Sequence, residues 1–111
     1  MAADTLQLLQ GTLDVLVLKT LTWGPNHGYG VARWIRDTTD DALAIEDGAL
    51  YTSLHRLERR GMVQSEWGAT DEGRRVKQYA ITADGRRALR AQAEQWQRYV
   101  SAVAKILQPA S

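Results

Sequence analysis

The strongest limit on the fold of this chain is an apolar seam in its last quarter. Thr82 suits the N-cap of a helix over residues 83–107, which would be about 37 Å long. Its apolar residues alternate spacings of four and three, as in a coiled coil, and are Leu89, Ala93, Trp96, Val100, Val103 and Leu107. The core of a 111-residue chain is too small to cover all of this seam. We therefore predict a homodimer through these residues, and the alternative is a helix folded back on its own domain.

The composition is that of a single small soluble domain. Hydrophobic residues make up 44% and charged residues 24% of the chain, and the formal net charge is +1. There is no run of roughly 20 apolar residues for a membrane helix, and the opening MAADTLQ lacks the basic-then-apolar order of a secretory signal. The absence of cysteine excludes disulfides and thiolate metal sites. We therefore expect a cytoplasmic protein with no membrane partner and no bound metal.

Two helices are predicted in the first part of the chain. Apolar residues between positions 6 and 21 cover more than one face of a helix, so this helix needs two packing partners. The turn residues at 23–28 end it, and a second helix follows over residues 29–38. Residues 37–47 carry five acids and no base, so we expect a solvated connection there.

A third predicted helix, over residues 48–61, has two contrasting faces. Asp47 suits its N-cap and Gly61 its C-terminal cap. At about 100° per residue, three leucines lie in one narrow arc and must face the core: Leu50, Leu54 and Leu57. The opposite side and its flank carry hydrogen-bonding and cationic side chains: Tyr51, Thr52, His55, Arg56 and Arg59. Such a face suits the major groove of DNA, which admits a helix and whose base edges accept hydrogen bonds from arginine.

After Gly61 the periodicity changes from helical to strand-like. Two extended runs flank a turn over residues 68–73 and predict a β-hairpin, in which Trp67 is expected to pack into the strand core. The basic residues of the hairpin are Arg74, Arg75 and Lys77. Three helices followed by a basic hairpin form a winged helix-turn-helix. We thus expect a mainly α fold with a small β-hairpin.

Two parts of the chain are predicted to have different roles. Residues 1–82 would form the DNA-binding domain, with its N-terminal helix also at the dimer interface, and residues 83–111 the dimerisation helix. The charge is unevenly divided as well, because residues 1–54 carry three basic and seven acidic side chains, whereas residues 55–111 carry eleven basic and six acidic. A positive half favours a polyanionic partner such as DNA, and the alternative is a solvated charged surface.

Three segments carry a recognisable pattern. They are Gly28-Tyr29-Gly30, the run GALYTSLHRLERRGMV at 48–63, and the run KQYAITADGR at 77–86. Together they resemble the PadR family of bacterial transcriptional regulators, over roughly residues 8–96. A chain with one helix after the wing is similar to the short branch of that family.

The resemblance implies a homodimeric winged-helix repressor that binds a palindromic operator in double-stranded DNA, with Tyr51 on the DNA backbone. It also implies a planar hydrophobic effector near the dimer interface, as in some members of the family. Trp96, with Ala93 and Val100, is the candidate ligand site because two symmetry-related indoles would flank a slot; simple dimer packing is the alternative. The alternative function is a winged-helix protein-interaction module without sequence-specific DNA binding.

No motif indicates an enzyme. Gly28-Tyr29-Gly30 matches only the first half of a dinucleotide-binding glycine pattern and does not follow a predicted strand. The two histidines, His27 and His55, have no neighbouring ligands at metal spacing, and there is no Gly-x-Ser-x-Gly motif. We therefore expect neither catalysis nor a cofactor.

Overall fold

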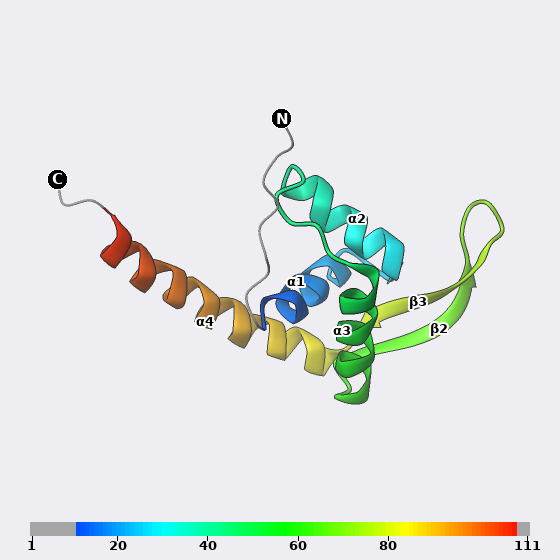
Figure 1. Ribbon diagram of the computed structural model, residues 1–111. Helices are drawn as coiled ribbons and strands as arrows, with labels where there is room; N and C mark the ends of the chain where they lie inside the picture. Colours follow the sequence, from blue (N-terminus) through cyan, green and yellow to red (C-terminus); the bar gives the residue numbers. More distant parts are fainter. Residues whose placement is uncertain (1–10, 109–111) are drawn as a thin grey trace.

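A computed structural model describes residues 11–108 of the chain (Figure 1). Its helices are α1 (Thr12–Leu21), α2 (Gly28–Thr38), α3 (Asp47–Arg59) and α4 (Ala83–Leu107). Its strands are β1 (Asn26–His27), β2 (Val63–Ala69) and β3 (Arg75–Ile81). The predicted order of three helices, hairpin and long helix is confirmed, while residues 6–10 of the predicted first helix lie outside the described residues.

The core forms around α1, which packs against α2, α3 and α4 (Figure 1). It contains Val17, Leu18 and Leu21 of α1, each at most 1% exposed. The other helices and the sheet contribute Val31, Ile35, Leu50, Leu54, Leu57, Val63, Tyr79 and Leu89. The prediction that the first helix needs more than one partner is therefore confirmed.

The small sheet has the order β1-β3-β2, and all its pairs are antiparallel. The hairpin was predicted, and its register places Trp67 opposite Lys77 and Val63 opposite Ile81. Strand β1 was not predicted, because it is only two residues long and lies within the turn at 23–28. It exists because Asn26 and His27 pair with Tyr79 and Gln78 of β3, a contact between distant segments.

The helix caps agree with the sequence in two of three cases. The Thr82 hydroxyl accepts a hydrogen bond of 3.0 Å from the Gly85 N–H at the start of α4. Gly61 follows the end of α3 with a φ of 74°, the left-handed conformation that ends many helices. The prediction for Asp47 is wrong, because α3 begins at Asp47 and the N-cap position belongs to Glu46, whose side chain makes no capping hydrogen bond.

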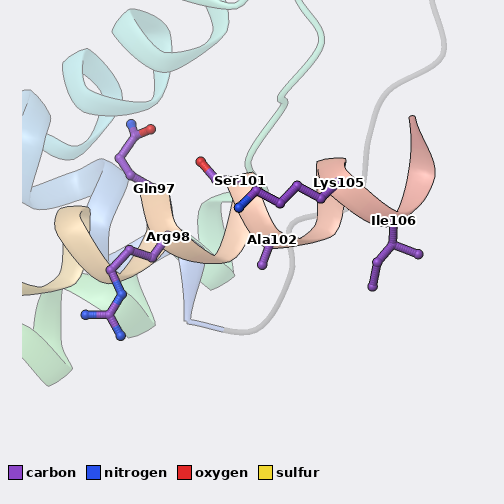
Figure 2. Close-up of a pocket in the computed structure, with 6 residues that line it drawn as sticks. All are labelled: Gln97, Arg98, Ser101, Ala102, Lys105 and Ile106. Atoms are coloured by element: carbon purple, nitrogen blue, oxygen red, sulfur yellow. The ribbon is translucent and has the colours of Figure 1, made fainter. Parts of the chain in front are cut away.

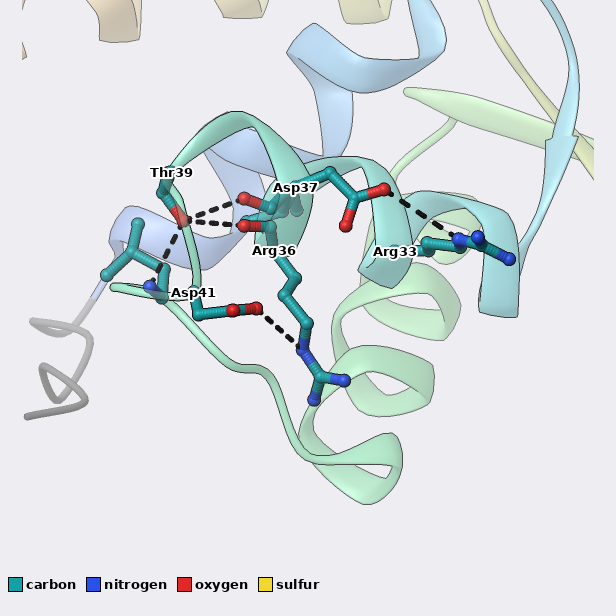
Figure 3. A network of polar contacts seen from close by, with 7 residues as sticks. Arg33, Arg36, Asp37, Thr39 and Asp41 are labelled. Atoms are coloured by element: carbon teal, nitrogen blue, oxygen red, sulfur yellow. Dashed lines mark hydrogen bonds and ion pairs between the residues drawn. The ribbon is translucent and has the colours of Figure 1, made fainter. Parts of the chain in front are cut away.

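The connection between α2 and α3 is held by a local polar network (Figure 3). The Thr39 hydroxyl donates to the Ile35 carbonyl at 2.8 Å and accepts from the Leu43 N–H at 3.1 Å. Two exposed ion pairs, Arg33–Asp37 and Arg36–Asp41, lie beside it. The acids of this segment are solvated as predicted, but Ile45 is buried in the core.

Helix α4 has two halves with different surroundings. Its first half packs on α1 and buries Leu89, whereas its second half extends away from the other helices (Figure 1). Leu107 at its end is 74% exposed. Leu89, predicted at the dimer interface, is instead in the core of its own chain. No helix within residues 11–108 is long and apolar enough to cross a membrane.

An open depression of about 530 Å³ lies along the second half of α4 (Figure 2). Its lining residues all belong to α4: Gln97, Arg98, Ser101, Ala102, Lys105 and Ile106. Because one helix alone forms it, this depression is a bare helix face and not a binding cavity.

Candidate nucleic-acid interface

Helix α3 is buried on one side and open on the other. Leu50, Leu54 and Leu57 face the core and are at most 1% exposed. The open side carries four of the predicted DNA-contacting residues, all exposed to solvent: Tyr51, Thr52, His55 and Arg59. The rings of Tyr51 and His55 are neighbours, with centroids 6.5 Å apart. The helix therefore offers a polar, partly aromatic and cationic face.

Arg56 is not on this open face, so its predicted orientation is wrong. Its Nε and Nη2 atoms donate to the two carboxylate oxygens of Asp14 on α1, at 3.0 and 2.5 Å. The Ser53 hydroxyl, one turn earlier, donates to the same carboxylate at 2.6 Å. Arg56 therefore fastens α3 to α1. An acid in the largely apolar α1 is the signal in the sequence that such a partner was needed.

The Asp14 carboxylate is held in its charged form. Burial raises the pKa of Asp14, but the hydrogen bonds from Arg56 and Ser53 and the positive charges of Arg56 and Arg60 outweigh this effect. The pKa of Asp14 is therefore lower than its ordinary value. The ion pair with Arg56 is consequently present at neutral pH.

The predicted basic residues of the wing lie at the outer part of the hairpin. Arg74 and Arg75 are exposed and Lys77 is half-buried. None of them takes part in the ion pairs found among residues 11–108. Their positive charge is therefore not neutralised by a carboxylate of the described chain.

Trp67 does not pack into the strand core, which corrects the prediction. It is 60% exposed, and the guanidinium of Arg75 lies 4.5 Å from the centroid of its ring. Val63 and Tyr79 fill the core where the sheet meets the helices, and Trp67 lies farther out along β2. Strand alternation determines the face of a residue but not its distance from the helices.

Two hydrogen bonds join the end of α3 to the elements that follow it. The Ser65 hydroxyl on β2 donates to Glu58 at 2.5 Å, and the Thr82 hydroxyl donates to the Gly61 carbonyl at 2.6 Å. The wing is thus held beside the helix. The basic wing and the open face of α3 form one candidate interface.

The comparisons with known proteins agree with this geometry. The family model described as "Transcriptional regulator PadR-like family" matches residues 17–91, from α1 into α4. The chain belongs to this PadR-like family. Transcriptional regulators of this family bind DNA and are not enzymes.

Solved structures of similar proteins have the same fold as this PadR-like regulator. A transcriptional regulator from Clostridium thermocellum has a TM-score of 0.81 and 28% identity, with 89% of this chain and 96% of that chain covered. A PadR family regulator from Eggerthella lenta has a TM-score of 0.76 and 34% identity, with coverages of 91% and 86%. A regulator from Thermoplasma acidophilum, named as putative, also has a TM-score of 0.76, at 27% identity and coverages of 91% and 95%.

The PadR-like chain also has a groove of about 610 Å³ between α1 and the middle of α4. Of the predicted ligand residues, Trp96 lines this groove, whereas Ala93 and Val100 do not. The other lining residues were not predicted from the sequence: Gly11, Thr12, Asp14, Val15, Leu16, Arg60, Gln92, Gln95 and Tyr99. The rings of Trp96 and Tyr99 stack with centroids 5.7 Å apart, so the lining of the groove combines two aromatic rings with the charged groups of Asp14 and Arg60.

The remaining residues of the predicted dimer seam lie at or near the surface of α4. Val100 and Leu107 are exposed, and Ala93, Trp96 and Val103 are half-buried. Beyond the seam, Tyr99 and Ile106 also expose large apolar surfaces. This half of the helix presents the largest group of exposed apolar side chains on α4.

Proposed function

We propose that this PadR-like regulator is a homodimeric repressor that binds a palindromic operator. The observation that carries the proposal is that two polar surfaces lie side by side: the open face of α3 and the cations of the wing, which form no ion pair among residues 11–108. In a winged-helix complex the helix enters the major groove, and the wing lies on the adjacent backbone or minor groove. The arrangement therefore matches two neighbouring sites on one duplex.

Each residue has a role in this proposal. Arg59 and His55 are placed to reach base edges or phosphates from α3, with Thr52 beside them, and Tyr51 offers its hydroxyl to a phosphate. Three cations of the wing neutralise phosphates: Arg74, Arg75 and Lys77. In this proposal Arg56 does not contact DNA, because its Nε and Nη2 groups bind Asp14 on α1 and direct the side chain toward that helix; it keeps α3 in place.

The proposed dimer forms through the exposed second half of α4. Val100, Val103 and Leu107 are the seam residues farthest from the core of their own chain. Burying them against a second copy would remove apolar surface from water. Each Å² buried would stabilise the dimer by about 25 cal/mol. The two copies of α3 would then need to lie about 34 Å apart, one turn of the duplex.

We further propose that a planar hydrophobic effector in the groove releases the operator. The volume of the groove, about 610 Å³, is within the usual range for small-molecule sites, and Trp96 with Tyr99 offers rings for stacking. The dimer would have two arrangements that differ in the distance between its two α3 helices. An effector that binds one arrangement more tightly than the other would shift the equilibrium toward that arrangement.

The experiment that tests DNA binding is a selection of bound fragments from the source genome, followed by fluorescence anisotropy on the enriched duplex. We expect retention of a palindrome at physiological salt, with affinity well above that for a shuffled duplex of the same composition. Equal affinity for both duplexes would contradict sequence-specific binding. It would favour a protein-interaction module in its place.

The effector is tested separately by tryptophan fluorescence with a panel of planar polycyclic compounds. We expect quenching together with release of the operator, and loss of both in Trp96→Ala. Trp23→Ala is the matched control, because it removes an exposed indole outside the groove. Unchanged fluorescence and operator affinity across the panel would show that Trp96 only packs the interface.

A further inference from the structure

Trp67 is a large aromatic side chain in an unusual place, on the outer part of the wing with 60% of its surface exposed. Because side chains alternate along strands, the register defines which residues share its face of the hairpin. They are Val63, Ser65 and Ala69 of β2, and Arg75, Lys77, Tyr79 and Ile81 of β3. The face of Trp67 therefore begins in the core and ends in two cations.

This face of the hairpin is turned toward α3. Val63 and Tyr79 on it are buried among the helices, and Ser65 donates its hydrogen bond to Glu58 of α3. Trp67 is the next residue on that face, two positions farther from the core. A duplex lying along the open side of α3 would consequently meet this face of the wing.

Within strands β2 and β3 the opposite face of the hairpin carries no positive charge, and Arg74 lies in the turn before β3. The polar residues of this face are Gln64, Glu66 and Gln78, and Val76 lies nearer the tip, opposite Gly68. The strands therefore offer a polyanion two cations, Arg75 and Lys77, on the side that carries Trp67 and none on the other side.

The contact between Trp67 and Arg75 restricts a flexible cation. Arg75 is a diagonal neighbour of Trp67 in the register, and its guanidinium carbon lies over the indole at 4.5 Å from the ring centroid. A guanidinium that stacks on a ring keeps its N–H donors free at its edge, so it can still bind a phosphate. The conformational entropy that the Arg75 side chain loses on binding DNA is then smaller than for an arginine that is free to move.

We propose that Trp67 is a positioning residue for DNA binding, which holds the Arg75 guanidinium so that its edge donates to a phosphate of the operator. The inference rests on the proposed DNA binding. It assigns to Trp67 a role through Arg75, and it does not require that the indole touch DNA.

The test is a double-mutant cycle on the full chain, measured as operator affinity by fluorescence anisotropy over a series of salt concentrations. Trp67→Thr keeps a strand-favouring residue and should weaken binding about two- to fivefold, the range for an exposed cation–π pair. Arg75→Gln should reduce the salt slope by about one. In the Trp67→Thr background, Arg75→Gln should change the affinity and the salt slope much less than it does in the unmodified chain. The single variant Trp67→Tyr, which keeps an aromatic ring, should retain most of the operator affinity.

Trp23→Ala is the matched control, because Trp23 is also exposed and has a cation, Lys19, 5.9 Å from its ring centroid at the end of α1. Its affinity should be unchanged, and thermal unfolding should show that all variants are folded. Additive effects of Trp67→Thr and Arg75→Gln would overturn the inference, as would equal losses in Trp23→Ala. If the unmodified protein binds no duplex in preference to a shuffled one, DNA recognition itself fails, which these variants cannot imitate.

Discussion

At the scale of single residues, Asp14 connects two surfaces with different proposed roles. It lines the groove between α1 and α4, and its oxygens accept hydrogen bonds from Arg56 and Ser53 of α3. A carboxylate that leaves water needs such donors, and removing the carboxylate leaves the donors without an acceptor. Asp14 therefore links α1 to α3, the helix proposed to enter the major groove.

Asp14→Asn should destabilise the fold by about 1–3 kcal/mol at neutral pH, measured by urea denaturation, because the ion pair with Arg56 is lost and one acceptor oxygen replaces two. The pKa of Asp14 in the folded chain is below its ordinary value of 3.8. Its stabilising effect is therefore complete above that value and is lost as the pH falls through the lower folded pKa. The two proteins should converge in stability at pH values below the lowered pKa of Asp14. A stability difference that does not change with pH would contradict this assignment.

Arg59→Ala should weaken operator binding without changing the thermal unfolding temperature, since its side chain is exposed on the open face of α3. A contact to a base edge should cost about 1–3 kcal/mol and relax the preference at one position, whereas a phosphate contact should weaken all sequences alike. Arg98→Ala, on the second half of α4, is the control and should bind normally. Full affinity in Arg59→Ala would show that this face of α3 is not the one that meets DNA.

At the scale of elements, the end of α3 and the start of α4 are locked together. The Thr82 hydroxyl donates to the Gly61 carbonyl and accepts from the Gly85 N–H, and the Thr82 N–H donates to the Met62 carbonyl at 3.0 Å. At Gly85 the backbone approaches so closely that a Cβ would overlap the Met62 carbonyl oxygen. The direction of α4 is therefore determined by the position of α3.

Gly85→Ala and Gly48→Ala form a matched pair that tests this junction. Both glycines are in the first turns of helices, but a Cβ at Gly48 meets no atom within 4 Å. Gly85→Ala should lower the free energy of unfolding by about 1–3 kcal/mol through steric overlap, and Gly48→Ala should raise it by up to about 1 kcal/mol through helix propensity. Equal effects of the two substitutions in urea denaturation would contradict the close approach at Gly85.

At the scale of the whole molecule, the described chain is elongated, with extents of 56 × 39 × 21 Å, because half of α4 stands away from the helical core. Apolar side chains on that half are exposed, including Ile106 at 83%. Large apolar side chains that gather on an exposed surface are typical of interaction sites. The proposed dimer supplies the missing cover.

Changing Val100 and Val103 together to Glu should give a monomer that binds a palindrome poorly, because four negative charges would meet across the proposed two-fold axis. Light scattering measures the mass directly. The control is Gln97→Glu with Ser101→Glu, which adds the same charge at exposed positions of the same half outside the seam. A dimer of normal stability in the valine variant would place the interface elsewhere.

Much of this arrangement can be predicted from periodicity, and the exceptions have physical reasons. The leucine stripe of α3 and the cap at Thr82 are local features, and both are confirmed. Arg56 was misplaced because a helical wheel does not show a partner 42 positions away in the sequence. Trp67 was misplaced because alternation does not show how far a hairpin extends beyond its core. The groove was only partly anticipated, through Trp96, because α1 and α4 form it together.

Because the junction fixes where α4 begins, the length of α4 determines both how far the exposed seam lies from α3 and in which direction it faces. Each residue inserted between the junction and the exposed seam would turn everything beyond it by about 100° and advance it by about 1.5 Å. One added residue would thus turn the seam about 100° away from the second copy in the proposed dimer, whereas seven would return it to the same side about 10.5 Å farther out. The turn at 70–74 has no such constraint, since it is at the tip of a hairpin. Related chains that share a half-site spacing in their operators should therefore keep the length of α4 fixed or change it by whole heptads.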